Sequence, residues 1–416
     1  MKLRYLWALA VAGSCGGVPW ARAAEPLRLE EAIGRALASN PVLVAEAAQL
    51  RAVDIHAQHE GLPPPYVVGG ELENVGGTGE VSGARSAETT LRIGRVIELG
   101  GKRAARQALG RAEVAQQRSA ADAARIEVAS RATARFIEVV ADQQRLVQAD
   151  ERVRQAERTR RVVASWVAAA RNPESDLRAA EIALADAELA REHAEHELTS
   201  ARTSLAATWG ALSPDFEAVA GNLAELPAVE PFEALAARLP DTLEQRALLM
   251  EERIVQARRH VAEASRKPDV NVSLGVRRLE GSDDQGLVMS VSVPLGNRPR
   301  AAYSIAEADA QLAALAARRD AGRLERHQAL FEKYQELKHA RTESESLRER
   351  MLPKAEQAFA FTRRGFEAGR FSFLALAQAE KTLFDLRARD VEATARYHTL
   401  LVEVDRLTAT VQDTTP

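Results

Sequence analysis

Two pairs of histidines are the residues of this chain whose type and spacing could bind a transition metal. Each pair is spaced three residues apart in a helix-forming segment and is followed by a glutamate: His56, His59 and Glu60, and His193, His196 and Glu197. This spacing places both rings of a pair on one helix face. Neither pair has the H-E-x-x-H pattern of a zinc hydrolase, so exposed polar positions are the simpler interpretation. We expect no bound metal and no cofactor.

Other catalytic chemistry has little support in the sequence. There is no G-x-x-x-x-G-K-[ST] phosphate-binding loop, and Cys15 is the only cysteine. The 56 Lys and Arg residues against 59 Asp and Glu residues give a net charge of −3, which leaves no basic surface for a nucleic-acid backbone. We therefore expect neither an enzyme nor a nucleic-acid-binding protein.

Residues 1–23 have the features of a signal peptide. Basic residues and an apolar core within residues 2–12 precede Ala21-Arg22-Ala23, which has the A-x-A form of a cleavage site. Lipidation of Cys15 is the alternative, although Ala12 stands where a lipobox normally has leucine. No later apolar run reaches the ~20 residues of a membrane helix. We expect an exported protein, either free in the periplasm or in the outer membrane.

The rest of the chain contains one unit twice, over 24–212 and 242–410, with a Pro-rich connector at 213–241 and a tail at 411–416. A heptad stripe of small and large apolar residues in the first unit recurs 199 residues later. Its members are Leu177, Ala180, Leu184, Ala187, Ala194, Leu198, Ala201 and Leu205, and then Leu376, Ala379, Leu383, Leu386, Ala393, Tyr397, Leu400 and Val404. A coiled-coil seam is the simplest interpretation of both stripes.

The stripe is interrupted at the same place in both units, by residues of opposite charge. Arg191 interrupts the first and Asp390 the second. Because duplicated helices place equivalent positions at the same height, we predict that Arg191 and Asp390 pair across neighbouring helices.

Ahead of each pair of long helices, the sequence changes to a two-residue alternation of apolar and polar side chains. The predicted strands are about 66–74, 87–99, 269–278 and 286–295, and the predicted long helices are about 102–170, 174–209, 300–367 and 371–410. The strands have the length of a tilted membrane crossing, but four strands cannot close a barrel. We therefore predict a mainly α protein with a small β part, whose strands close only when several chains assemble.

The first predicted strand carries two acidic residues on its polar face. Glu71 and Glu73 are separated by one residue, so both side chains point to the same side of a sheet. In a barrel that side faces the lumen, where carboxylates favour the passage of cations. Simple solvation of the barrel interior is the alternative role.

With its leader, duplication, strand pairs and long helices, the chain resembles the TolC-like family of outer membrane factors. The resemblance rests on Leu27-Arg28-Leu29-Glu30-Glu31-Ala32, Asn40-Pro41, Leu352-Pro353, and Gly369-Arg370 before Leu376-Ala377-Gln378-Ala379. The phrase Glu98-Leu99-Gly100-Gly101-Lys102-Arg103, preceded by Glu71-Leu72-Glu73-Asn74, is similar to the cobalt-zinc-cadmium resistance branch (CzcC-like).

This resemblance implies a homotrimer in the outer membrane, with a 12-stranded β-barrel continuous with a periplasmic α-helical barrel. Such a trimer is a passive exit duct for heavy-metal cations such as cobalt, zinc and cadmium. It works with a periplasmic adaptor (membrane fusion) protein and an inner-membrane RND pump. The alternatives are an outer membrane factor for drugs or other small molecules, and a soluble periplasmic coiled-coil adaptor.

The resemblance also implies that the helix-turn-helix tips bind the adaptor and hold the gate. The candidate tip residues are Arg171, Asp176, Arg364, Glu367 and Arg370. In drug-exporting relatives two aspartates narrow the pore, but the matching positions here are Ala375 and Gln378. Asp176 is the repeat-related counterpart of Ala375, so we consider an acidic constriction at Asp176, with a capping or solvated aspartate as the alternative.

Overall fold

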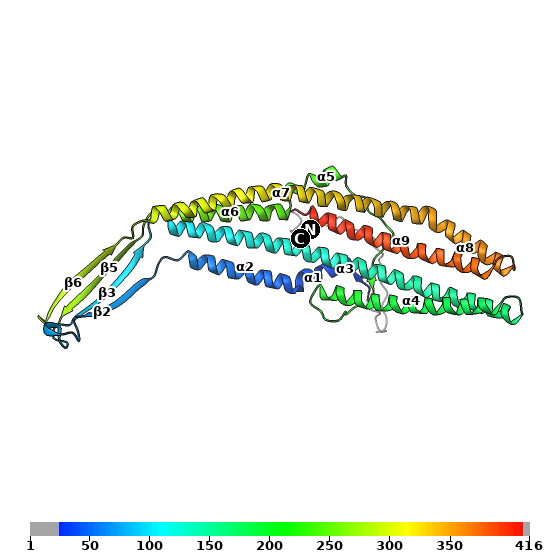
Figure 1. Cartoon of the computed structure of the whole chain (residues 1–416), viewed down its shortest axis with the longest axis horizontal. Coiled ribbons are helices and arrows are strands. Elements are labelled where there is room, and N and C mark those ends of the chain that lie inside the picture. Colours follow the sequence, from blue (N-terminus) through cyan, green and yellow to red (C-terminus); the bar gives the residue numbers. More distant parts are fainter. Residues whose placement is uncertain (1–24, 411–416) are drawn as a thin grey trace, which may run out of the picture. The chain divides into compact units, whose positions relative to one another are not determined.

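The computed structural model describes residues 25–410, so the predicted leader, Cys15 and the predicted tail lie outside it (Figure 1). The protein is mainly helical with a small sheet, as predicted. Its described residues form two compact units. The first contains residues up to Ala45, Asp122–Leu243 and residues from Arg323 onward, and the second contains Glu46–Ala121 and Glu244–Gly322. Each unit therefore draws on both sequence repeats.

The second unit contains a four-stranded sheet in the order β2-β3-β5-β6, with all neighbours antiparallel. The strands are β2 (Tyr66–Glu73), β3 (Glu88–Ile97), β5 (Val270–Leu279) and β6 (Asp284–Ser292). Pairing of β3 with β5 joins the hairpin of one repeat to the hairpin of the other (Figure 1). Asn74 and Asp283 adopt positive φ angles of 55° and 59° directly after β2 and before β6, a conformation that Asn and Asp tolerate better than other side chains.

Four helices contribute to the second unit: α2 (Pro41–Glu60), the first part of α3 (Lys102–Ala168), α6 (Leu243–Ala264) and the first part of α7 (Asn297–Ser346). Gly110 lets α2 and α3 approach closely, because a Cβ added there would lie 2.7 Å from the Cβ of Ala57. Val255 of α6 packs against Ala308 and Leu315 of α7 in a small buried cluster.

The first unit contains two helical hairpins. One joins α3 to α4 (Glu174–Ala207), and the other joins α7 and α8 (Leu352–Glu367) to α9 (Phe373–Leu407). Most members of the repeated stripe are buried: Ala180, Ala187, Ala194, Leu198, Ala201 and Leu205 in α4, and Leu376, Leu383, Ala393, Tyr397, Leu400 and Val404 in α9. The stripe is therefore a packing seam, as the heptad pattern predicted.

The helix predicted over 300–367 contains a wide turn that the sequence did not indicate. Residues Leu347–Met351 form a π-helical turn, η3, between α7 and α8. Pro353 follows this turn and cannot donate a backbone hydrogen bond, and its ring crowds the preceding turn of an α-helix. A local widening relieves that conflict while the helix continues to Glu367.

The remaining elements of the first unit are short and hold the connector against the helices. They are β1 (Leu27–Arg28), α1 (Leu29–Ser39), β4 (Val219–Ala220), α5 (Phe232–Ala236) and η2 (Leu239–Asp241), while η1 (Gly79–Val81) lies in the β2–β3 loop of the second unit. β1 pairs with β4 in parallel. Leu235 and Leu239 pack with Tyr397, whose hydroxyl donates to the carbonyl of Pro227.

Leu330 tests this core. Its side chain is fully buried in the cluster with Leu337 and Tyr397, so Leu330→Ala removes packed atoms and leaves a cavity. We expect a loss of about 2–5 kcal/mol of stability. Leu324→Ala is the control, because Leu324 lies on the same helix with 74% of its surface exposed. Thermal unfolding followed by circular dichroism in detergent measures both. Equal melting temperatures for the two variants would contradict this packing.

Candidate functional site

The four-stranded sheet has two chemically different faces. Large apolar side chains lie exposed on one face: Tyr66, Val68, Leu72, Leu91, Ile93, Leu274, Val276, Leu287, Met289 and Val291. The other face carries most of the polar and small side chains: Gly69, Glu71, Glu73, Glu88, Thr90, Arg92, Gly94, Asn271, Ser273, Gly275, Arg277, Asp284, Gly286, Ser290 and Ser292, together with Val67, Val96, Leu279 and Val288. An exposed apolar sheet face of this extent requires an apolar environment.

Both predicted lumen acids lie on the polar face, and each has an arginine partner on another strand. Glu71 of β2 forms an ion pair with Arg92 of β3 at 3.4 Å. Glu73 of β2 forms an ion pair with Arg277 of β5 at 2.8 Å. The two arginines were not singled out from the sequence, because their distance from the acids depends on strand register. In the sequence, their alternation with apolar residues indicated only that they lie on the polar face.

Arg95 is the one charged residue in the middle of the apolar pattern of β3, and on that face it stacks on the neighbouring Tyr66. Its guanidinium carbon lies 4.9 Å from the ring centroid of Tyr66. Its Nε donates to the carbonyl of Pro64 at 3.1 Å and its Nη1 to the Tyr66 hydroxyl at 3.3 Å. The long side chain thus carries its charge to the strand end.

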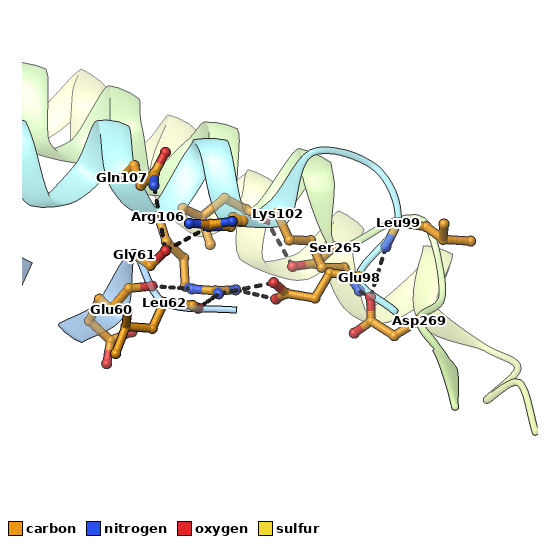
Figure 2. A network of polar contacts seen from close by, with 12 residues as sticks. Glu60, Gly61, Leu62, Glu98, Leu99, Lys102, Arg106, Gln107, Ser265 and Asp269 are labelled. Carbon is orange, nitrogen blue, oxygen red and sulfur yellow. Dashed lines mark hydrogen bonds and ion pairs between the residues drawn. The ribbon is translucent and has the colours of Figure 1, made fainter. Parts of the chain in front are cut away.

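The phrase from Glu98 to Arg103 forms the junction between the sheet and the helices of the second unit (Figure 2). Arg106 pairs with Glu98 and donates to the carbonyls of Glu60 at 2.8 Å and Leu62 at 3.3 Å. Lys102 pairs with Asp269 at 2.6 Å. The first turns of α3 therefore contact three segments: the residue after β3, the end of α2 and the residue before β5.

A glycine is needed at this junction for two reasons. Gly100 has a φ of 81°, which side chains rarely adopt, and a Cβ added there would lie 2.8 Å from the carbonyl oxygen of Ala264. The segment between β3 and α3 thus packs directly on the end of α6.

The helical turns at 168–173 and 368–372 lie at the same end of the first unit. An apolar cluster joins their four helices through Val163 of α3, Ala180 of α4, Phe366 of α8 and Phe373 of α9. The rings of Trp166 and Phe366 lie 4.6 Å apart between the two hairpins. The structure therefore brings the two predicted tip segments together.

The charged tip candidates contact residues of their own hairpin, in the turns or in the helix ends beside them. Arg171 stacks over Trp166 at 5.4 Å, and Arg364 stacks over Phe361 at 4.9 Å. Glu367 pairs with Arg363 at 3.9 Å, and the backbone N–H of Arg370 donates to the carbonyl of Gly365 at 2.8 Å. Asp176, in the first turn of α4, accepts from the side chain of Asn172 at 2.8 Å. A negative charge in the first turn of a helix also interacts favourably with the positive end of the helix dipole.

The predicted pairing of Arg191 with Asp390 is wrong within the described chain. Arg191 of α4 pairs with Asp150 of α3 at 2.7 Å and with Glu195 at 2.6 Å. Asp390 of α9 pairs with Arg348 of η3 at 2.9 Å. The reason is that each residue faces the partner helix of its own hairpin. The two hairpins carry an equivalent interhelical ion pair with the charges exchanged.

Two titratable side chains are half-buried between elements of the first unit. Burial raises the pKa of the Glu380 carboxyl, which accepts from the Thr159 hydroxyl of α3 at 3.3 Å. Burial lowers the pKa of the His398 ring, whose Nε2 lies 3.2 Å from the carbonyl oxygen of Leu223. Glu380 thus links α9 to α3, and His398 links α9 to the connector.

Three of the four paired histidines lie next to glutamates on their own helices. His193 pairs with Glu197 at 3.2 Å, His196 with Glu192 at 3.6 Å and His59 with Glu60 at 3.7 Å, all on exposed helix surface. Within residues 25–410, no three His, Cys, Asp or Glu side chains are grouped so that they could hold a metal ion.

None of the helices in the described part of the chain combines the length and the apolar character needed to cross a membrane.

Comparison with known proteins identifies the family. A model of the family described as outer membrane efflux protein matches residues 236–410. The cobalt-zinc-cadmium resistance protein CzcC of Cupriavidus metallidurans is 30% identical over 388 residues, covering 92% of this chain and 90% of that protein. The chain belongs to the outer membrane efflux protein family. Its resemblance to the TolC-like factors and their CzcC-like branch is thereby confirmed, and the alternative of a periplasmic adaptor is excluded.

Further members of the outer membrane efflux protein family and solved structures agree. The nickel and cobalt resistance protein CnrC of the same organism is 29% identical over 324 residues, covering 77% of this chain and 74% of that protein. CusC has the same fold, with a TM-score of 0.77 at 14% identity over 95% of both chains. VceC of Vibrio cholerae has a TM-score of 0.74 at 15% identity, over 92% of this chain and 96% of that one.

Arg106→Gln tests the sheet–helix junction. It leaves the Glu98 carboxylate, whose side chain is 13% exposed, and two backbone carbonyls without their donor. We expect a loss of about 1–3 kcal/mol and faster protease cleavage within residues 61–65. Limited proteolysis of the detergent-purified protein measures this, with the exposed Arg111→Gln on the same helix as control. Unchanged cleavage in Arg106→Gln would argue against the junction.

Glu380→Gln tests the half-buried carboxyl through the pH dependence of stability. Because the folded-state pKa is raised, the folded protein retains the proton over a range where the unfolded chain has lost it, so stability falls as pH rises through the folded pKa. We expect Glu380→Gln to melt at a higher temperature than wild type above that range and equally below the ordinary value of 4.5. Glu392→Gln, exposed on the same helix, is the control. A pH-independent difference would refute the assignment.

Proposed function

We propose that this protein is the outer membrane channel of a tripartite RND-type efflux system and forms a passive exit duct for heavy-metal cations. The observation that carries the proposal is the sheet of the second unit. Its apolar face is exposed, and its outer strands β2 and β6 each have one edge without a strand partner among the described residues. A sheet with these properties is suited to lipid only when its edges are paired.

In a homotrimer, the backbone groups at both edges of the sheet find hydrogen-bond partners. β6 of one chain pairs with β2 of the next, so that three copies of the four-stranded sheet close a 12-stranded barrel in the outer membrane. The apolar face then contacts lipid and the face with Glu71 and Glu73 lines the lumen. The helices continue the duct into the periplasm, and the solved structures with the same fold support this arrangement.

The cargo class rests on the named relatives. CzcC is a cobalt-zinc-cadmium resistance protein and CnrC a nickel and cobalt resistance protein, and both match over most of this chain. The polar sheet face carries Glu71, Glu73, Glu88 and Asp284 against two arginines, a set that admits cations. Export of drugs or other small molecules is the second candidate, since fold alone does not set the cargo.

We assign the docking of the periplasmic adaptor to the two helical turns. The aromatic cluster around Trp166 and Phe366 holds the turns together, and Arg171, Arg364, Glu367 and Arg370 lie on them. Asp176 is our candidate for an acidic constriction at this end. Its carboxylate is partly exposed beside Asn172.

Deletion and complementation test the proposed function. Cells without the gene should become more sensitive to one or more of cobalt, zinc, cadmium, nickel, copper and silver, and plasmid-borne wild type should restore growth. Tolerance of organic drugs is measured in parallel as the control. Unchanged metal tolerance together with lost drug tolerance would favour the second candidate. Recovery of the protein in the soluble fraction rather than in carbonate-washed outer membranes would overturn the channel assignment.

A further inference from the structure

Two glutamates on the polar sheet face stand directly opposite each other. Glu73 of β2 is the cross-strand partner of Glu88 of β3. Like charges at such positions repel, and the repulsion weakens strand pairing unless a cation intervenes. The opposed pair lies beside the loops, at the end of the sheet away from the junction with α3.

Arg277 of β5 supplies that cation from the far side of β3. Its Nη2 donates to Glu73 at 2.8 Å and its Nη1 to Glu88 at 2.6 Å. Its Nε donates to the Thr90 hydroxyl at 2.9 Å. One guanidinium therefore bridges three strands, and each of its three nitrogens has an acceptor.

The opposite side of the pair is also fixed. Asn74, which turns the chain out of β2, donates from its Nδ2 to the Glu88 carboxylate at 2.9 Å. The side chain of Arg277 is 32% exposed and that of Glu88 is 23% exposed. A guanidinium that makes several hydrogen bonds at once holds its geometry better than an isolated surface ion pair does.

The charge balance around the opposed pair follows from these contacts, and Asp284 of β6 adds a further acid at the loop end of this face. Glu73, Glu88 and Arg277 together carry one net negative charge, and the nearby pair of Glu71 with Arg92 is neutral. The carboxylates thus offer far less negative potential than their number suggests. A pore must attract an ion without holding it, and two opposed carboxylates with no counter-charge would retain a divalent cation.

From this geometry we infer that Arg277 is a tethered counter-ion that sets the cation preference of the channel at the loop end of the sheet. The inference rests on the proposed function, since it requires the polar face to line a pore. Arg277 occupies the place between Glu73 and Glu88 that a passing cation would otherwise take. It leaves the cluster of Glu73, Glu88 and Arg277 with one net negative charge in each chain, which favours cations but leaves them free to exit.

Reversal potentials in a salt gradient test this with the full-length protein in planar lipid, using potassium chloride as the probe. Arg277→Gln should raise the potassium-to-chloride permeability ratio about twofold, an estimate for one added unscreened charge per chain at moderate salt. Glu73→Gln should lower the ratio, because the remaining pair of Glu88 and Arg277 is neutral.

The double variant Glu73→Gln/Arg277→Gln is the charge-matched control. It retains Glu88 alone, so the net charge equals that of wild type and the opposed pair is gone. Its permeability ratio should match wild type. Arg278→Gln is a second control, since Arg278 lies on the other face and contacts Glu280 and Asp283. It should leave the ratio unchanged.

The outcomes separate this inference from the proposed function. Equal ratios for wild type, Arg277→Gln and Glu73→Gln would overturn the inference while leaving the channel intact. A double variant that behaves like Arg277→Gln would also overturn it, because charge would then not be the cause. If Arg277→Gln fails to assemble, the permeability ratios of Glu73→Gln, the wild type and the double variant test the inference. A Glu73→Gln ratio equal to the other two would overturn it. A wild-type protein that forms no pore would overturn the proposed function itself.

Discussion

The unpaired backbone at the edges of the sheet is the constraint on which the rest of the structure depends. β2 and β6 each present one row of N–H and C=O groups with no strand partner in the described chain. In lipid each such group costs several kcal/mol, whereas in water the exposed apolar face would be unfavourable. The closure with further copies that we propose would remove both costs.

The polar face of the sheet shows how charges are accommodated next to one another on paired strands. Glutamates are placed where strand register brings an arginine within reach, as with Glu71 and Arg92, and Glu73 and Arg277. Close strand packing beneath them depends on small residues. A Cβ added at Gly275 would lie 2.5 Å from the carbonyl oxygen of Leu91 and 2.9 Å from the Cβ of Arg92, so a larger residue would not fit opposite Arg92.

In the helical hairpins, the two repeats share the same apolar packing but not the same charges. The apolar seam is retained from α4 to α9, because a buried position accepts few side chains. The interhelical ion pair is retained with reversed polarity, as Arg191 with Asp150 and Asp390 with Arg348. Attraction between two charges does not depend on which helix carries which sign, so both versions satisfy the same contact. The π turn before Pro353 distinguishes the second hairpin within this common plan.

Local periodicity in the sequence determined the strands, the long helices and the repeated seam, because these patterns depend only on near neighbours along the chain. The family resemblance likewise followed from short phrases such as residues 98–103. The partners of individual charges required the tertiary structure, since Arg277 lies 204 positions from Glu73 and meets it only through two strand registers. The same reason explains the wrong pairing of Arg191 with Asp390: equivalent height in a repeat does not specify which helix is the neighbour, and that choice is made by packing.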